Sequence, residues 1–224
     1  MKQATAGRVR RHPGARMIQM LLVMLLVGGC ETAYYGAMEK IGFHKRDIMV
    51  DRVEDAMESQ QEAQEEFQNA YERFSSVVSV PASDLEKTYR RLNDAFERAE
   101  AKAAEVTERV DRVESVSEAL FVEWREEIEE IGDGALRASS SRQLKDSQAQ
   151  YQTLIKAMRR AESRMDPVLG TFRDYVLYLK HNLNAQAIAS LRGELSGVEA
   201  DVSELIRDME ASIAQAREFI SQMD

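Results

Sequence analysis

Apolar residues recur at alternating intervals of three and four along most of the chain. From residue 85 onward this spacing meets an apolar or small side chain at every step: Leu85, Tyr89, Leu92, Phe96, Ala99, Ala103, Val106, Val110, Val113, Ser117, Leu120 and Trp124. These intervals place the side chains on one face of an α-helix, where they form the apolar seam of a coiled coil. The spacing therefore predicts one long helix from Leu85 to Ile131, ended by Gly132 and Gly134.

The same spacing recurs in three other segments. A seam without interruption covers residues 188–223, and another covers residues 144–179. Pro167 falls inside the latter, but the apolar positions resume after it, so we expect a kink or a short break there. A shorter stripe predicts the first helix over about residues 47–78.

Three turn signals, at residues 79–82, 132–141 and 181–184, separate the four helices. Connections this short join antiparallel neighbours. Each helix carries only a narrow apolar stripe, which becomes stable when other helices cover it. The sequence therefore predicts an all-α fold, an elongated antiparallel coiled-coil bundle of about four long helices, in a domain over residues 47–224. Three prolines and 7% aromatic residues in 224 agree with an all-helical chain.

The first 29 residues follow a different pattern. Five basic side chains precede an apolar run at residues 17–27, which two glycines follow. This is the order of a secretory signal peptide. The run is well short of the ~20 residues that a membrane-spanning helix needs. We therefore expect residues 1–29 to be a signal peptide that is removed.

Cys30 is the only cysteine and directly follows this segment. The sequence Val27-Gly28-Gly29-Cys30 resembles the lipobox of bacterial lipoproteins, which implies cleavage before Cys30 and acylation of its thiol and its new N-terminus. The alternative is a cysteine near an ordinary cleavage site by chance. A sole cysteine forms no intramolecular disulfide, and one thiolate is a poor metal site. Attachment to membrane lipid through Cys30 is the favoured interpretation.

The resemblance to lipoproteins also bears on location. Residues 31 and 32 are Glu and Thr, not the aspartate that commonly signals inner-membrane retention in two-membrane bacteria. We therefore expect a lipid-anchored protein of the cell envelope, in the outer membrane and facing the periplasm.

Residues 30–46 form the membrane-proximal linker. The linker has aromatic and aliphatic residues in its middle and ends in a basic cluster, Lys40, His44, Lys45 and Arg46. Such a segment suits an amphipathic stretch that binds anionic headgroups. A plain linker before the first helix fits equally well, so both interpretations stay open.

The loop before the last helix contains His181, Asn182 and Asn184. Asparagines at a helix boundary are typical caps, which is the simpler interpretation. The same residues at a loop tip also suit a docking site for a partner protein, because loops on a rigid support often carry recognition.

The charge balance argues against nucleic acid as a partner. After residue 29 the chain has 25 basic and 39 acidic side chains, a balance of −14, and shows no local basic patch. Six acidic residues lie near the end of the second helix: Glu123, Glu126, Glu127, Glu129, Glu130 and Asp133. A solvent-exposed acidic face is a simpler interpretation of this cluster than a calcium site.

The chain shows few of the residues that catalysis requires. It contains no glycine-rich phosphate loop, no nucleophile elbow and no Glu-x-x-His spacing. We therefore expect no enzyme, no cofactor and no metal, although carboxylates paired across a bundle would escape such a search.

Two stretches are distinctive: HKRDIMVDRVEDA at residues 44–56 and MDPVLGTFRDYVLYLKHNLNAQAIASL at residues 165–191. Together with the sequence around Cys30 they resemble an uncharacterised bacterial lipoprotein family catalogued as domain of unknown function 2959. The resemblance covers nearly all of the chain after the signal peptide. It implies a coiled-coil-rich envelope lipoprotein and brings no established activity.

The sequence thus favours a binding or scaffold module whose partner is an envelope protein, an envelope polymer or a second copy. The alternative is a periplasmic chaperone or envelope-stress adaptor with an exposed apolar groove.

Overall fold

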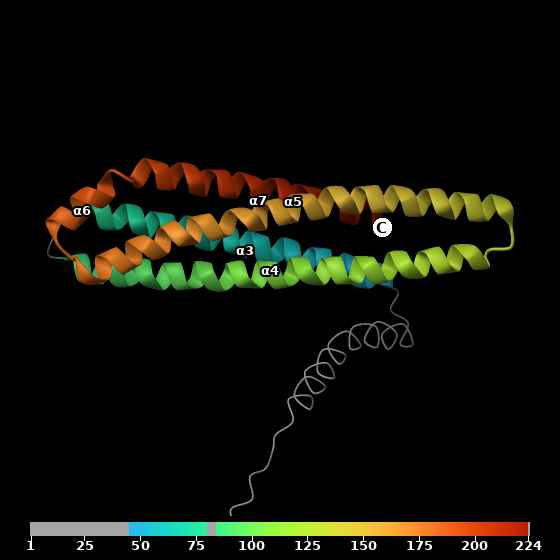
Figure 1. Ribbon diagram of the computed structural model, residues 1–224, viewed down its shortest axis with the longest axis horizontal. Coiled ribbons are helices and arrows are strands. Elements are labelled where there is room, and N and C mark those ends of the chain that lie inside the picture. The colour runs from blue at the N-terminus through green and yellow to red at the C-terminus, as the bar shows by residue number, and fades with distance from the viewer. Residues whose placement is uncertain (1–44, 80–83, 224) are drawn as a thin grey trace, which may run out of the picture. The chain divides into compact units, whose positions relative to one another are not determined.

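The structure is a computed structural model that describes residues 45–79 and 84–223. These residues form five helices, of which four are long (Figure 1): α3 (Lys45–Ser79), α4 (Leu85–Glu130), α5 (Gly134–His181), α6 (Ala185–Arg192) and α7 (Leu195–Met223). The predicted all-α, antiparallel bundle is confirmed. Cys30, Lys40 and His44, with the predicted signal peptide and the rest of the predicted linker before Lys45, lie outside the described residues.

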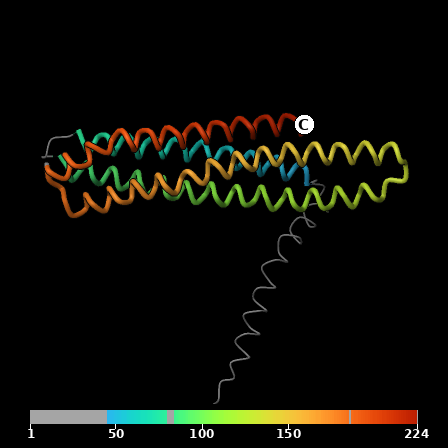
Figure 2. The backbone as a smooth tube through the Cα atoms, turned by 45° about the horizontal axis from the view of Figure 1, so that its top comes forward, coloured from blue at the N-terminus to red at the C-terminus, as the bar shows by residue number. Residues whose placement is uncertain are grey.

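Each long helix packs against two others and so closes a four-membered ring. α3 contacts α4 and α7, and α5 contacts the same two helices. α3 and α5 are therefore diagonal to each other, as are α4 and α7; Figure 2 shows the four long tubes running along one another. The core lies along the axis, where the seams meet, and its largest fully buried side chains include Phe67, Phe74, Phe172, Leu92 and Met158.

The seam of α3 is regular along its length. Its buried positions keep intervals of three and four: Met49, Val53, Ala56, Gln60, Ala63, Phe67, Ala70, Phe74 and Val77. Burying each large side chain contributes about 1.5–3 kcal/mol, so the seam is a major source of stability. The helix begins at Lys45, two residues before the predicted start.

The connection between α4 and α5 is much shorter than predicted. Only residues 131–133 separate the helices, so the expected loop over residues 132–141 is wrong for all but its first positions. The Asp133 carboxylate accepts hydrogen bonds from the backbone N–H groups of Ala135 and Leu136, at 2.8 and 2.9 Å. This N-cap satisfies two free donors and lets a serine-rich segment start a helix.

The last predicted helix is divided into two. Residues 193 and 194 form a turn between α6 and α7, in which Gly193 and Glu194 donate to carbonyls three residues back, at 3.3 and 3.1 Å. The break lets α6 lie against the end of α3, where the Arg192 guanidinium donates to the Val78 carbonyl at 3.2 and 2.9 Å. By contrast, α5 runs through Pro167 without a break.

Two helices extend beyond the other two at one end. Lys45, at the start of α3, is paired with Glu123 at 2.7 Å, and α4 continues for seven residues past that point. At a rise of 1.5 Å per residue this extension is about 10 Å long. Trp124 Nε1 donates to Ser140 Oγ across it at 2.9 Å, and Ile128 and Leu144 are buried. Figure 1 shows the α4–α5 hairpin reaching past the C-terminus.

Some buried side chains of the core are polar and lack hydrogen-bond partners. Gln60 is fully buried in the α3 seam, and neither polar atom of its side chain has a hydrogen-bond partner among the described residues. The same holds for the hydroxyl oxygens of Ser59 and of Ser212 in α7. A buried polar group without a partner costs about 1–3 kcal/mol. These side chains therefore lower the stability of the bundle.

Replacing Gln60 with leucine tests this cost. Because leucine fills a similar volume without polar atoms, Gln60→Leu raises the free energy of unfolding in urea by about 1–3 kcal/mol. Gln68→Leu makes the same change at an exposed position of α3 and shifts the free energy of unfolding by less than about 0.5 kcal/mol. A loss of stability in Gln60→Leu would show that the amide has partners in solution.

Candidate functional site

Interhelical ion pairs are the main polar feature of the bundle surface. Arg159 on α5 takes part in these pairs and has three carboxylate partners. Its guanidinium lies 2.6 Å from carboxylate oxygens of both Asp111 and Glu114 on α4, and 2.7 Å from Glu162. These hydrogen bonds, with Glu114 first, raise the pKa of Arg159 above its ordinary value. Arg159 thus stays charged and joins α4 to α5.

Other cations of α5 reach both of its neighbours. Arg164 binds Asp208 and Glu204 of α7 at 3.0 and 2.6 Å, and Arg173 binds Glu100 of α4 at 2.5 Å. Across α3 and α4 the ion pairs are Arg98–Glu66, Lys102–Glu62 and Arg109–Asp55. Every one of these pairs joins helices that are adjacent in the ring, so charge complementarity and the apolar seams specify the same arrangement.

Two grooves follow the α4–α5 interface. The first, of about 440 Å³, is lined by charged residues that include Arg159, Glu162 and Arg173, which are already engaged in ion pairs. The second, of about 680 Å³, is more apolar and contains the edge-to-face pair Phe121 and Tyr151, with ring centroids 5.5 Å apart. Burial raises the pKa of Tyr151, so its hydroxyl stays protonated at neutral pH.

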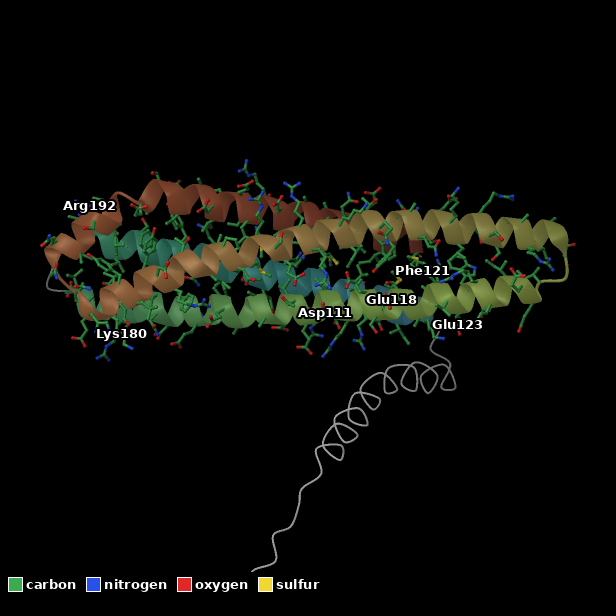
Figure 3. All side chains as sticks on the ribbon, viewed as in Figure 1. Asp111, Glu118, Phe121, Glu123, Lys180 and Arg192 are labelled. Carbon is green, nitrogen blue, oxygen red and sulfur yellow. The ribbon has the colours of Figure 1, made fainter. Side chains whose placement is uncertain are left out.

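The predicted site residues lie at opposite ends of the bundle. Lys45 and Arg46 are the first two residues of α3, beside α4; Lys45 is engaged with Glu123, while Arg46 is exposed. His181 ends α5 at the other end. Figure 3 shows the same separation, with Glu123 toward one end and Lys180 and Arg192 at the other.

The loop asparagines act as local hydrogen-bonding groups. Asn184 is the N-cap of α6 and accepts from the Ala187 backbone N–H at 3.0 Å, which confirms the capping prediction for this residue. Asn182 follows α5 and donates its amide to the Tyr178 carbonyl at 2.9 Å. Beside them the side chains of Leu177 and Tyr178 are 53% and 40% exposed. This end therefore combines a hydrogen-bonded loop with two exposed apolar side chains.

The acidic end of α4 is a solvent-facing surface. Glu126, Glu127, Glu129 and Glu130 are exposed. Among residues 45–79 and 84–223, no three His, Cys, Asp or Glu side chains are arranged to hold a metal ion. In the same part of the chain, no helix combines the length and apolarity that a membrane crossing requires.

The positive charge of α5 is a feature that was not predicted from the sequence. This helix has nine Arg and Lys against four Asp and Glu, a balance of +5, whereas α3 has four against nine, a balance of −5. The expectation of no local basic patch is therefore wrong. A charge count for each predicted helix would have found the difference, which the net charge of the whole chain conceals.

The described residues thus define an antiparallel bundle of four long helices, with a short fifth helix at one end and a two-helix extension at the other. The chain belongs to the family described as Protein of unknown function (DUF2959), which matches residues 34–223. This confirms the resemblance seen in the sequence. No curated protein and no solved structure matches the chain.

Arg159 provides a test of the ion-pair network. Arg159→Gln removes three charge-assisted contacts and leaves the acidic α4 side without its cation, so the free energy of unfolding falls by about 1–2 kcal/mol. Urea unfolding at low and high salt measures this loss, which shrinks at high salt. Arg142→Gln is the matched control, because Arg142 is an exposed cation of α5 that forms no ion pair within the described residues. Equal effects of the two variants would contradict the role of the network.

Proposed function

We propose that the chain is a lipid-anchored protein of the bacterial cell envelope that serves as a binding or scaffold module. The observation that carries this proposal is the lipobox-like sequence ending in Cys30, which is followed within fifteen residues by a rigid helical bundle. Such an arrangement holds a folded surface at a membrane. The proposed location is the outer membrane, with the bundle in the periplasm.

The direction of α3 supports a spacer role. The linker enters the bundle at Lys45, and α3 then runs 35 residues to the opposite end, about 52 Å at 1.5 Å per residue. That end carries the loop with His181, Asn182 and Asn184, beside exposed Leu177 and Tyr178. We propose this loop as the docking site for an envelope protein, held away from the anchored end of the chain.

The linker is long enough to accommodate the two-helix extension. The extension reaches about 10 Å beyond the start of α3. Fifteen residues between Cys30 and Lys45 reach at most about 50 Å when fully extended. A bundle attached through Cys30 therefore has room for residues 131–133 next to a membrane surface.

The distribution of apolar side chains favours a scaffold over a chaperone. The four seams cover one another, and the large apolar side chains exposed in the described residues are few and spread over several turns: Val122, Leu136, Leu177 and Tyr178. A chaperone that binds unfolded chains needs a continuous apolar groove. This distribution supports the scaffold proposal over the chaperone alternative.

Cys30→Ser tests the anchor. Serine has no thiol to acylate, so the variant loses incorporation of an alkyne-labelled fatty acid and leaves the membrane pellet. Bacteria that express the full chain are fractionated to measure membrane attachment, and in-gel detection of the label measures acylation. Thr32→Ser, a similar change two residues away, keeps label and membrane attachment. Membrane retention of an unlabelled Cys30→Ser protein would contradict the proposal.

Glu31→Asp tests the proposed outer-membrane location. The resemblance to lipoproteins implies that aspartate after the acylated cysteine causes inner-membrane retention. The variant therefore moves from the outer- to the inner-membrane fraction in a sucrose gradient, while Glu31→Gln stays in the outer membrane. Native protein already in the inner-membrane fraction would contradict the location and leave the anchor intact.

A further inference from the structure

The outward side of α3 is mainly acidic. Six exposed carboxylates recur at helical spacing opposite the buried seam, and we call them the anionic face: Asp47, Asp51, Glu54, Glu58, Glu65 and Glu72. None of the ion pairs among the described residues involves any of them. They extend over about 38 Å of helix, since each residue rises 1.5 Å.

The outward side of α5 has the opposite sign over residues 142–160. Four exposed cations, here called the cationic face, lie opposite the buried positions of this helix: Arg142, Lys145, Lys156 and Arg160. Arg160 also pairs with Asp208 of α7 at 3.0 Å, whereas the other three have no ion pair within the described residues. Asp146 is the one acidic residue in this interval on the outward or α7-facing side. The face is about 27 Å long.

The two faces point in opposite directions across the bundle. α3 and α5 are diagonal in the ring, so the outward sides of these helices are on opposite flanks. The flank formed by α4 carries neighbouring opposite charges instead, as in the pairs Arg90–Glu86 and Arg112–Glu108. The bundle is therefore electrically polar across its width, a property that the net charge of −9 does not reveal.

We propose that the cationic face of one copy binds the anionic face of a second copy, so that bundles associate side by side. The occupant follows from charge complementarity: two helical faces of opposite sign, whose charged residues lie three to eleven positions apart on one side of each helix, can align along their lengths. Because the two surfaces differ, the contact is heterologous, and each pair of copies leaves one face of each sign open for further copies. The product is a row of bundles. This proposal uses only the bundle surface and does not depend on the anchor at Cys30.

The association is weak and depends on salt. Exposed ion pairs each contribute little, and the acidic chain as a whole repels its copies at long range. Only close contact between the two faces offsets this repulsion. Raising the salt concentration from about 0.1 M to about 1 M shortens the screening length from ~10 to ~3 Å and separates the copies.

Zero-length crosslinking of the full chain tests the contact. The protein is reconstituted in neutral phosphatidylcholine vesicles as a mixture of isotope-labelled and unlabelled copies, and a carbodiimide joins amines to carboxylates that touch. We expect crosslinks between copies that join Lys145 or Lys156 to carboxylates of the anionic face, in a ladder of oligomers. A protein without such crosslinks at about 0.1 M salt would overturn the proposal.

Charge reversal sharpens this test. The triple variant Arg142→Glu with Lys145→Glu and Lys156→Glu leaves one arginine beside three carboxylates on the cationic face, and Asp51→Lys with Glu54→Lys, Glu58→Lys and Glu65→Lys leaves two carboxylates beside four lysines on the anionic face. Because the triple variant lacks the amines that carbodiimide couples, association is measured instead by energy transfer between copies labelled with donor and acceptor fluorophores at an introduced C-terminal cysteine. Each variant alone loses about tenfold of this signal. When mixed, they recover it, because each can then pair only with the other. Glu127→Lys with Glu130→Lys, at the exposed end of α4, keeps the native signal and controls for a change of net charge.

The outcomes separate a second copy from other occupants. Unchanged far-UV circular dichroism and melting of all variants show that the bundle is intact, since every position changed is exposed. Recovery in the mixture supports the proposal. An energy-transfer signal that survives both reversals, or a mixture that does not recover, overturns it. If the triple variant of the cationic face loses only binding to phosphatidylglycerol vesicles and keeps its energy-transfer signal, the cationic face binds lipid and the proposal is wrong.

Discussion

Burial of narrow apolar seams is the constraint on which the rest of this structure depends. A helix with charged residues around most of its circumference gains little by itself, so each seam must be covered by other helices. Four such seams on one chain with short connections close into a ring, and the ring fixes which helices are adjacent. The cations of α5, above all Arg159 and Arg164, then find carboxylates on both sides. Hydrophobic spacing and charge placement therefore specify the same order of helices, as expected for a sequence that favours one fold.

Much of the fold follows from the sequence because the seams are long. The intervals of three and four predicted all four long helices, since a periodic signal over many turns outweighs local irregularity. The division at Gly193 escaped prediction because the seam continues across it; the break is accompanied by a tertiary contact, that of Arg192 with the end of α3, which the sequence does not reveal. The early start of α5 escaped because three consecutive serines resemble a loop until Asp133 is seen to cap the helix.

The interaction surfaces were harder to foresee for a different reason. The basic cluster and the loop at residues 181–184 are each a short stretch of sequence, so both could be identified without the structure. Only the structure, however, places Lys45 against Glu123 and the asparagines at helix ends. The two charged faces are not contiguous. Their members are three to eleven residues apart, and the significance of their opposite sign depends on α3 and α5 being diagonal, which is a property of the ring.

The most direct test of the account is whether α7 folds back on α3 within one molecule. Spin labels at Glu65 on α3 and Arg207 on α7, in residues 30–224 with Cys30→Ser and diluted with unlabelled protein, report this intramolecular distance by pulsed electron resonance. Because neighbouring helix axes are about 10 Å apart, the account predicts a narrow distribution at roughly 15–30 Å, including the label arms. A distribution centred beyond about 40 Å would mean that the seams do not close in this ring, and would contradict the account.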